Sequence, residues 1–377
     1  MITKLKKQFS DNLLSYRGWK TKRKIVVIES DDWGSIRMPS KEAYDRLLKE
    51  NIRVDKCPYN QYDSLESGED LSELFQVLSK HKDKQNKPAL ITANFIMANP
   101  DFDAMKQDSP LTFKNELFPE TYKRYQGREG SLELVHTGIK EGLLKAQCHG
   151  REHVNVLRWL KFLNADSRET MQAFEQNLFG LSQTITTEKR GSFLAAYDYN
   201  EESEKGNYKH IIEEALSSFT RVFNYNSASF IAPNYCWEDT VEEALLQGGV
   251  QIIQSGRVQV KSDLSKKRFI KHYTGERNAR NQVYTVRNCH FEPSLRQNRA
   301  SAIDNCLKEI ETAFLWKTPA IICSHRLNFM GSIVQDNRDE NLRLLDSLLG
   351  GIVRKWPDVE FLSSDQLGQL ILKKALH

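Results

Sequence analysis

The sequence predicts an α/β fold, a parallel barrel in which strands alternate with helices. Short apolar runs rich in β-branched residues alternate with amphipathic segments over most of the chain, a pattern typical of parallel βαβ units. Seven to nine such repeats over roughly 350 residues fit a closed or nearly closed (β/α) barrel better than an open sheet.

Nine runs fit strands, and amphipathic segments between them fit helices. The expected strands are Lys24–Glu29, Ala89–Phe95, Lys145–His149, Ser192–Tyr197, Ala228–Ala232, Val250–Gln254, Val283–Arg287, Pro319–Ser324 and Val359–Leu362. The expected helices include Leu71–Lys80, Leu132–Leu144, Ile211–Phe219, Val241–Leu246, Ile303–Phe314 and Asn341–Val353.

We expect a single domain over residues 1–377, with two insertions. Residues 99–130 are polar, contain three prolines and show little periodicity, and residues 261–282 are basic and polar. Long loops at the strand ends of a barrel commonly shape the substrate site. No internal repeat, low-complexity tract or interdomain linker is evident in the sequence.

The composition of the chain limits the kinds of molecule that we expect it to bind and the compartment in which we expect it. The net charge is only +4, from 54 Lys and Arg against 50 Asp and Glu, which does not favour nucleic-acid binding. No stretch approaches the roughly 18 apolar residues of a membrane span, and the first residues lack the apolar core of a signal peptide. The six cysteines form no CxxC pair, so we expect a reduced, cytoplasmic protein. The sequence does not indicate an oligomeric state.

Two carboxylates, Asp31 and Asp32, follow the first expected strand. An Asp pair often caps a helix or forms an Asx turn. When buried together, however, two carboxylates repel each other unless a cation lies between them or one is protonated. A divalent ion held by one of them would relieve that repulsion and leave the other to accept a proton from a bound water.

Two histidines follow the third expected strand, in His149-Gly150-Arg151-Glu152-His153. Histidines at i and i+4 share one face when the segment is helical, so both can reach one metal ion. With a carboxylate they would form a 2-His-1-carboxylate site. The order HxxEH also occurs in inverted zinc proteases, where Glu152 would be the base, but there the motif lies on a helix rather than at a strand end.

Other polar and aromatic residues also follow expected strands, and in a barrel the carboxyl ends of the strands carry the active site. His325 is a candidate proton donor because histidine titrates in the useful pH range. Trp33, Tyr235 or Trp237 are candidates for stacking on a sugar. The expected substrate-binding residues are Trp33, Asn94, Pro233, Asn234, Tyr235 and Arg326.

These residues, in this order, resemble the polysaccharide deacetylase family, also called carbohydrate esterase family 4 or NodB-homology enzymes. Its T-F-D-D-G motif is similar to residues 29–33, which implies that Asp31 is the general base and Asp32 a metal ligand. Its H-[ST]-x-x-H motif is similar to residues 149–153, which implies that His149 and His153 are ligands. Its Leu-x-His motif is similar to residues 323–325, which implies that His325 is the general acid. The resemblance spans roughly Lys24 to Leu370 and implies the family's distorted (β/α) barrel.

The chain departs from the family pattern around these motifs. The R-x-P-[YF] motif aligns with residues 231–235, where Ile231 replaces the arginine that supports the base in the family. Arg37, Arg151, Arg287 and Arg326 are candidate substitutes, and the sequence does not distinguish among them. Trp33 occupies the place of the family's glycine, with Gly34 one position later.

The resemblance implies a metal-dependent hydrolase that removes N- or O-acetyl groups from a sugar or polysaccharide precursor. The donor set favours Zn²⁺, with Co²⁺, Ni²⁺ or Fe²⁺ as alternatives. A second hypothesis is a glycan-binding or scaffold protein that has lost catalysis, favoured by the missing arginine and by the absence of the family's D-x-x-D-W motif. A non-haem Fe(II) oxygenase also uses a 2-His-1-carboxylate set, but its usual β-sandwich scaffold does not fit the strand–helix alternation.

Overall fold

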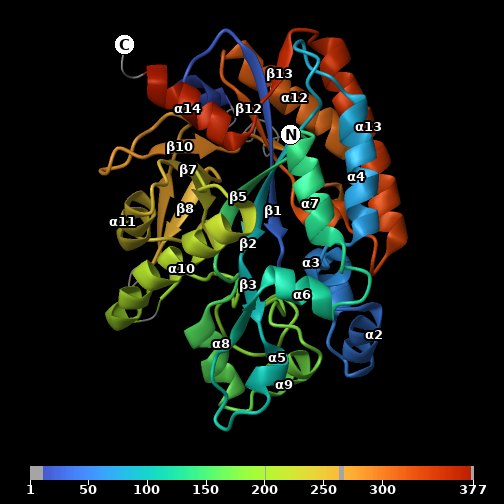
Figure 1. Cartoon of the computed structure of the whole chain (residues 1–377), viewed down its shortest axis with the longest axis vertical. Helices are drawn as coiled ribbons and strands as arrows, with labels where there is room; N and C mark the ends of the chain where they lie inside the picture. The colour runs from blue at the N-terminus through green and yellow to red at the C-terminus, as the bar shows by residue number, and fades with distance from the viewer. Residues whose placement is uncertain (1–11, 200, 263–266, 375–377) are drawn as a thin grey trace.

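The computed structural model describes residues 12–199, 201–262 and 267–374, and a nine-stranded parallel sheet lies at its centre (Figure 1). The strand order is β10-β7-β6-β5-β2-β1-β12-β11, and β13 pairs with the first residues of β1, on the side of β1 opposite to β12. The strands are β1 (Lys24–Trp33), β2 (Ile91–Ile96), β5 (Leu144–Gly150), β6 (Ser229–Ile231), β7 (Ile252–Ser255), β10 (Val283–Val286), β11 (Cys289–His290), β12 (Ala320–Cys323) and β13 (Val359–Phe361).

The two strands at the ends of this order are joined by a short connection, which closes the sheet into a barrel. β10 and β11 lie at opposite ends of the strand order, yet only Arg287 and Asn288 separate them in the chain. The Arg287 backbone N–H donates to the Ser255 carbonyl at 3.0 Å, and the Asn288 N–H donates to the Ile321 carbonyl at 3.1 Å. These two residues therefore bridge β7 to β12, which confirms the distorted (β/α) barrel.

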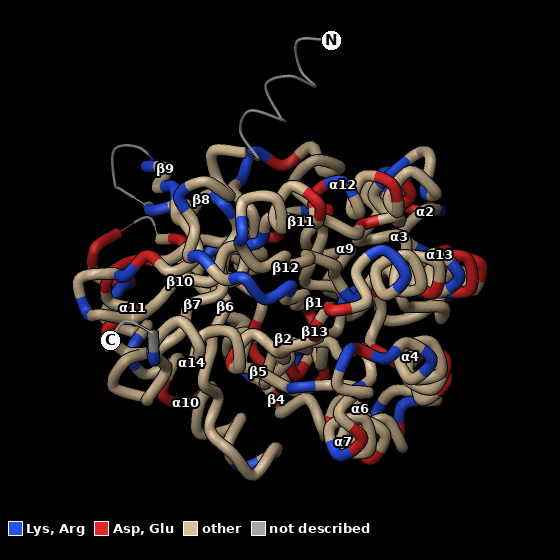
Figure 2. Tube along the Cα trace, turned by 90° about the horizontal axis from the view of Figure 1, so that it is seen from above, with Lys and Arg blue, Asp and Glu red and all other residues tan. Residues whose placement is uncertain are grey.

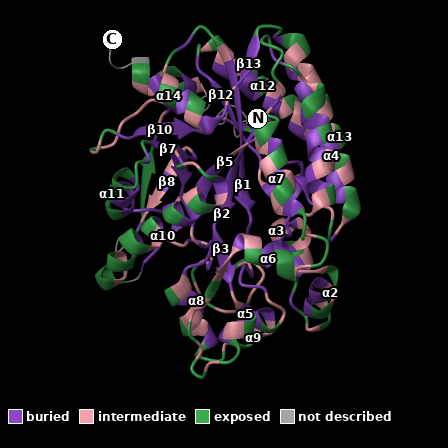
Figure 3. Cartoon of the chain, viewed as in Figure 1, coloured by how far each residue is buried: buried purple, intermediate pink, exposed green. Residues whose placement is uncertain are grey.

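Helices cover the outside of the sheet, so the strands are buried on both faces and read as continuous apolar runs (Figure 3). The α4–α7 and α12–α13 helices pack on one side, α10 and α11 on another, and α14 against β10. The longer helices are α2 (Lys41–Lys49), α4 (Gly68–Lys80), α7 (Ser131–Lys140), α8 (Val156–Leu163), α9 (Arg168–Glu175), α10 (Gly206–Phe223), α11 (Asp239–Gln247), α12 (Ser301–Leu315), α13 (Gln335–Lys355) and α14 (Ser364–Lys374). The shorter helices are α3 (Pro58–Tyr62), α5 (Phe102–Met105) and α6 (Phe118–Arg124).

One of the nine expected strands is wrong. Ser192–Tyr197 forms turns rather than a strand, although Phe193, Ala195 and Tyr197 are buried. The Asn155 backbone N–H donates to the Phe193 carbonyl at 2.7 Å, so this run lies against the start of α8 and not in the sheet. Its apolar character therefore reflects packing beneath a helix, which a short run cannot distinguish from a strand.

The two expected insertions each contain a small antiparallel hairpin. In the first, β3 (Ala98–Pro100) pairs with β4 (Asn115–Leu117), with α5 and α6 beside them. In the second, β8 (Val258–Lys261) pairs with β9 (Arg268–Lys271). Among the described residues no helix is both long and apolar enough to cross a membrane. Positive and negative positions are interspersed around the chain (Figure 2).

Candidate metal and proton-transfer site

A bulge at the end of β1 brings two adjacent carboxylates into one cavity. Side chains alternate between the two faces of a regular strand, so neighbours normally point apart. The pairing of β1 with β2 shifts register between Ser30 and Trp33, and Asp32 has a φ of 76°. An extra residue in the left-handed region is a feature of β-bulges, and Asp adopts that region more readily than most residues. Asp31 and Asp32 therefore both line the cavity.

Asp32 lies between two imidazoles from the end of β5 and the loop after it. Its Oδ1 is 3.6 Å from His149 Nε2 and 3.2 Å from His153 Nε2. Tetrahedral zinc ligands, each about 2.0–2.2 Å from the ion, lie roughly 3.3–3.6 Å apart. The two oxygen–nitrogen separations are thus close to those of a metal site, the three ligand atoms lie within 4.8 Å of one another, and all three side chains are buried.

The hydrogen bonds of these residues also fit a metal. The His149 Nδ1–H donates to the Ile231 carbonyl at 2.8 Å, which leaves the lone pair of Nε2 facing Asp32. Asp32 Oδ1 is buried and has no hydrogen-bond partner among the described residues. Such an acceptor is costly to leave unpaired, and a divalent ion would satisfy it.

The two histidines reach this position without the helix that their spacing suggested. His149 is the penultimate residue of β5, and no helix includes His153. Gly150 between them has a φ of 122°, where an L side chain is strained. The chain turns sharply at this glycine, and the two rings come to lie 5.1 Å apart at their centroids.

Burial and charge set the protonation of this group. Burial lowers the pKa of His153 to about 3 in spite of the nearby Asp32, so this imidazole is neutral and able to bind a metal. Burial would raise the pKa of Asp32, but the nearby Arg37 guanidinium lowers it well below its usual range, so Asp32 is ionised. Arg37 Nη2 donates to Asp32 Oδ2 at 3.3 Å.

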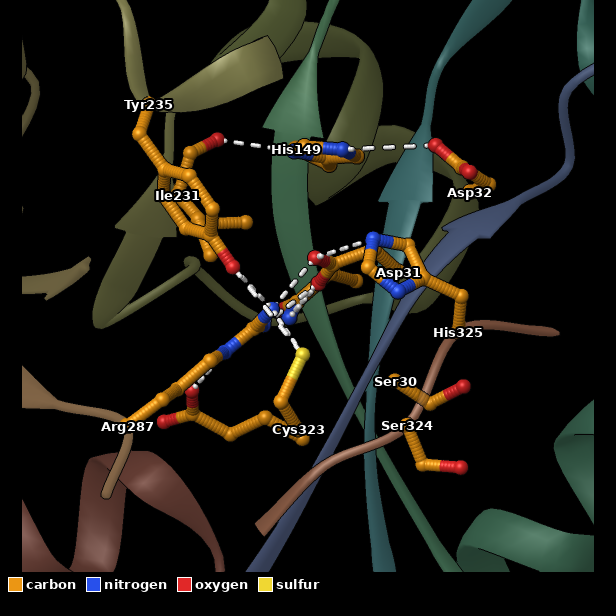
Figure 4. Close-up of polar contacts among 12 residues, drawn as sticks. Ser30, Asp31, Asp32, His149, Ile231, Tyr235, Arg287, Cys323, Ser324 and His325 are labelled. Atoms are coloured by element: carbon orange, nitrogen blue, oxygen red, sulfur yellow. Dashed lines mark hydrogen bonds and ion pairs between the residues drawn. The ribbon is translucent and has the colours of Figure 1, made fainter. Parts of the chain in front are cut away.

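Asp31 is held by a buried guanidinium from the point where the barrel closes (Figure 4). Arg287 Nη1 donates to Asp31 Oδ2 and Nη2 donates to Oδ1, both at 2.6 Å, and Arg287 Nε donates to Glu29 at 2.7 Å. Asn94 adds a donor to Asp31 Oδ1 at 2.7 Å. Burial would raise the pKa of Asp31, but Arg287 reverses this and lowers it, which keeps Asp31 ionised.

His325 lies on the other side of Asp31, with its Nε2 3.7 Å from Asp31 Oδ2. Its Nδ1 donates to Glu292 Oε1 at 2.6 Å, and Asn328 donates to the other oxygen of Glu292 at 2.6 Å. Burial would lower the pKa of His325, but Tyr59 and Glu292 raise it well above its usual value. Of these two neighbours, Glu292 is the one that carries a negative charge. His325 is therefore suited to donate a proton, because the Glu292 carboxylate favours its protonated form.

Glu292, Cys323 and His325 also bring ligand atoms within 4.8 Å of one another. The carboxylate of Glu292 already accepts both the side-chain and the backbone N–H of His325, the latter at 2.9 Å. These bonds account for the cluster as a proton-transfer pair, and we do not assign a metal to it.

The two groups face a cavity of about 370 Å³, a volume in the range of small-molecule sites. Its lining residues are Asp31, Asp32, Arg37, Cys57, Tyr59, His149, His153, Gly180, Ser182, Leu194, Ala232, Asn234, Tyr235 and His325. Of the expected substrate-binding residues, only Asn234 and Tyr235 line it. The Tyr235 hydroxyl accepts a hydrogen bond from Arg287 at 2.9 Å.

The remaining expected substrate-binding residues do not line this cavity. Trp33 is fully buried against Phe95 and donates from Nε1 to Ser30 at 2.9 Å. Arg326 is fully buried in ion pairs with Asp63 and Glu66. Pro233 is buried, and Asn94 donates to both Asp31 and Gln254. The stacking candidate Trp237 is also buried and donates to Glu242.

Of the four candidate arginines, Arg287 is the one that pairs with Asp31. Arg151 pairs with Glu152 and Glu214 instead. Glu152 lines a different pocket, between α8 and α10, so its position does not fit the base of an inverted zinc protease.

Sequence reasoning missed Tyr59 and Glu292. Tyr59, in α3, meets His325 edge-on at 5.4 Å between ring centroids, and no motif marks it. Glu292 follows the two-residue strand β11, which is too short to be predicted from a pattern. A polar residue just before Pro293 is the one local signal, and it is weak.

Comparisons with known proteins concern the fold. No family model matches the chain, and no curated protein matches it in sequence. The structure of a Parabacteroides distasonis protein assigned as a glycoside hydrolase/deacetylase superposes with a TM-score of 0.52 at 8% identity, covering 95% of this chain and 72% of that one. A Mycobacterium smegmatis protein assigned as a polysaccharide deacetylase gives 0.45 at 11% identity, covering 95% and 94%. The first of these agrees with the deacetylase-type barrel predicted from the sequence.

Proposed function

We propose that the protein is a metal-dependent hydrolase that deacetylates an N- or O-acetylated saccharide. One observation carries the proposal. An unpartnered carboxylate oxygen of Asp32 faces the Nε2 atoms of His149 and His153. The neighbouring carboxylate of Asp31 faces His325, which in turn donates a hydrogen bond to Glu292. A group able to bind a metal and a pair able to move protons thus share one cavity.

In this proposal Asp32, His149 and His153 hold a divalent ion, with Zn²⁺ as the first choice for a nitrogen and oxygen donor set. When bound, such an ion polarises an acyl carbonyl and lowers the pKa of a water. Asp31 accepts the proton of the attacking water at Oδ2, the oxygen nearer His325. Arg287 fixes the orientation of that carboxylate, and His325 gives its Nε2 proton to the leaving amine or alcohol.

The alternative of a non-catalytic glycan-binding protein rested on the missing arginine of the R-x-P-[YF] motif and on the absence of a D-x-x-D-W motif. Arg287, from the junction between β10 and β11, makes the bidentate pair with Asp31 that such an arginine would make. A scaffold would need neither this pair nor the Glu292–His325 pair to hold a sugar. We therefore favour catalysis.

A saccharide precursor inside the cell is the substrate source that we propose. All six cysteines are buried and free of disulfides, as is usual in a reducing compartment. Detection of the native protein in an extracytoplasmic fraction would contradict this placement.

The test is metal content by elemental analysis, beside acetate release from acetylated sugars, for wild type, Asp32→Ala and His149→Ala. We expect about one equivalent of metal in wild type, with metal and turnover lost in both variants. His210→Ala is the matched control because His210 is exposed and lies outside the cavity. The absence of metal in wild type after incubation with excess divalent ions would contradict the proposal.

A further inference from the structure

One cation in the cavity has an unused donor. The side chain of Arg37 is only 5% exposed. Its Nε donates to Asp63 at 3.2 Å and its Nη2 to Asp32 at 3.3 Å, but its Nη1 has no hydrogen-bond partner among the described residues. Buried donors in folded proteins are nearly always paired, and an unpaired one on a charged group is especially costly. A ligand that accepts a hydrogen bond from Nη1 would remove this cost.

This buried donor lies at the border of the cavity. Arg37 and Gly180 both line the cavity, and a Cβ added to Gly180 would stand 3.5 Å from Nη1. The absence of a side chain at Gly180 thus leaves room in front of the guanidinium. Asn60 fixes this segment by donating to the Gly180 carbonyl at 2.9 Å and accepting from the Ser182 N–H at 3.1 Å.

The charges around Arg37 suit an anion once the proposed metal is bound. Its neighbours form a buried network in which Arg37 pairs with Asp32 and Asp63, and Arg326 pairs with Asp63 and Glu66. Three carboxylates thus face two guanidiniums. A divalent ion on Asp32 would make this corner of the cavity net positive. Guanidinium nitrogens bind carboxylate and phosphate oxygens with strong, charge-assisted hydrogen bonds.

We propose that Arg37 Nη1 binds an anionic oxygen of the substrate, so that the protein acts on an acylated saccharide that carries a carboxylate or a phosphate. The inference rests on the proposed function and adds the substrate class. The role of Arg37 is specificity, because it would touch a substituent of the sugar while Asp31 and His325 face the scissile bond.

The experiment is direct binding to the metal-loaded protein of three sugars: neutral N-acetylglucosamine, its 1-phosphate, and N-acetylmuramic acid, which adds a carboxylate. We expect at least one anionic sugar to bind about tenfold or more tightly than the neutral one, as a charge-assisted hydrogen bond provides. The anionic sugar that binds more tightly shows whether the substrate carries a phosphate or a carboxylate. Acetate release is measured in parallel.

Two variants connect the preference to Arg37. Gly180→Ala keeps the guanidinium but places a methyl against Nη1 at ordinary contact distance, and Arg37→Lys keeps the charge but removes the fork. Both should lose most of the anion preference while retaining metal. Arg53→Lys, an exposed arginine paired with Asp55, is the control that should retain the preference.

The outcomes separate this inference from the proposed function. Acetate release with equal affinity for all three sugars overturns the inference and leaves the function standing. An anion preference without acetate release supports the inference and contradicts the function. A preference that survives in both variants overturns the inference, because the anion then binds elsewhere, for example at the metal.

Discussion

The two halves of the cavity differ in how completely their polar atoms are paired. On the metal side, Asp32 Oδ1, His153 Nδ1 and Arg37 Nη1 are buried without hydrogen-bond partners among the described residues. On the proton-transfer side, both oxygens of Asp31 and both oxygens of Glu292 accept hydrogen bonds, and Arg287 donates from all three nitrogens.

This difference indicates which half the protein completes by itself. The proton-transfer half is preorganised by the fold, because Arg287 donates to both Glu29 and Asp31 and these contacts lie within the chain itself. The metal half is arranged but unsatisfied, so binding should add free energy there. The halves should therefore respond in opposite ways to substitution and to metal.

The largest expected effect on stability is that of Arg287→Met. Removing this guanidinium leaves Glu29 and Asp31 buried without their cation, and breaking a buried ion pair in this way costs about 3–5 kcal/mol. Denaturant unfolding of the metal-free protein measures the loss, and turnover should disappear with it. Arg287→Lys should lose less stability. An unfolding free energy within about 1 kcal/mol of wild type would show that this half is not preorganised by Arg287.

The next effect is on rate alone. His325→Gln should lower kcat by about 10²–10⁴-fold, the usual contribution of a general acid, with metal content unchanged. In the proposed mechanism the protonated form of His325 is the active one, and its pKa is raised, so activity should fall as pH rises through that pKa. The variant should lack this alkaline limb. A variant with the same limb would assign the titration to another group.

Metal binding should stabilise the other half. Zinc at about 100 times its Kd should add roughly 2.7 kcal/mol to the free energy of unfolding, seen as a rise in Tm that a chelator reverses. His153→Gln should abolish this rise because it removes one ligand. Arg287→Met, although less stable, should still show it. A zinc-dependent rise that persists in His153→Gln would place the ion elsewhere.

A smaller effect tests how Glu292 loads His325. Glu292→Gln removes the negative charge that favours the imidazolium, so the pKa of His325 should fall. The alkaline limit of activity should move to lower pH while metal affinity stays the same. Glu340→Gln, a half-exposed partner of Arg299, should leave the profile unchanged. An unchanged limit in Glu292→Gln would mean that Glu292 only positions the ring.

The sequence predicted the reactive residues that follow the strands, but not the residues that support them. The Asp31–Asp32 pair and the two histidines are local patterns at strand ends, and a parallel barrel brings such ends together. Arg287 could not be chosen from four candidates because its pairing depends on where the barrel closes, between β10 and β11. Glu292 belongs to the same junction. Contacts made by barrel closure join residues that are far apart in the chain, so no short stretch of sequence indicates them.

The bulge in β1 explains why Trp33 lies outside the cavity. In an unbroken strand Asp31 and Trp33 would share a face, but the register shift at Asp32 turns Trp33 into the core beside Phe95. Trp33→Phe should therefore cost about 1–3 kcal/mol of stability through lost packing and the lost bond to Ser30. Its effect on function should be the smallest of all, with sugar affinity and metal content unchanged. A weakened Kd for sugar in a stably folded Trp33→Phe protein would instead place this ring in the binding site and remove the role assigned to the bulge.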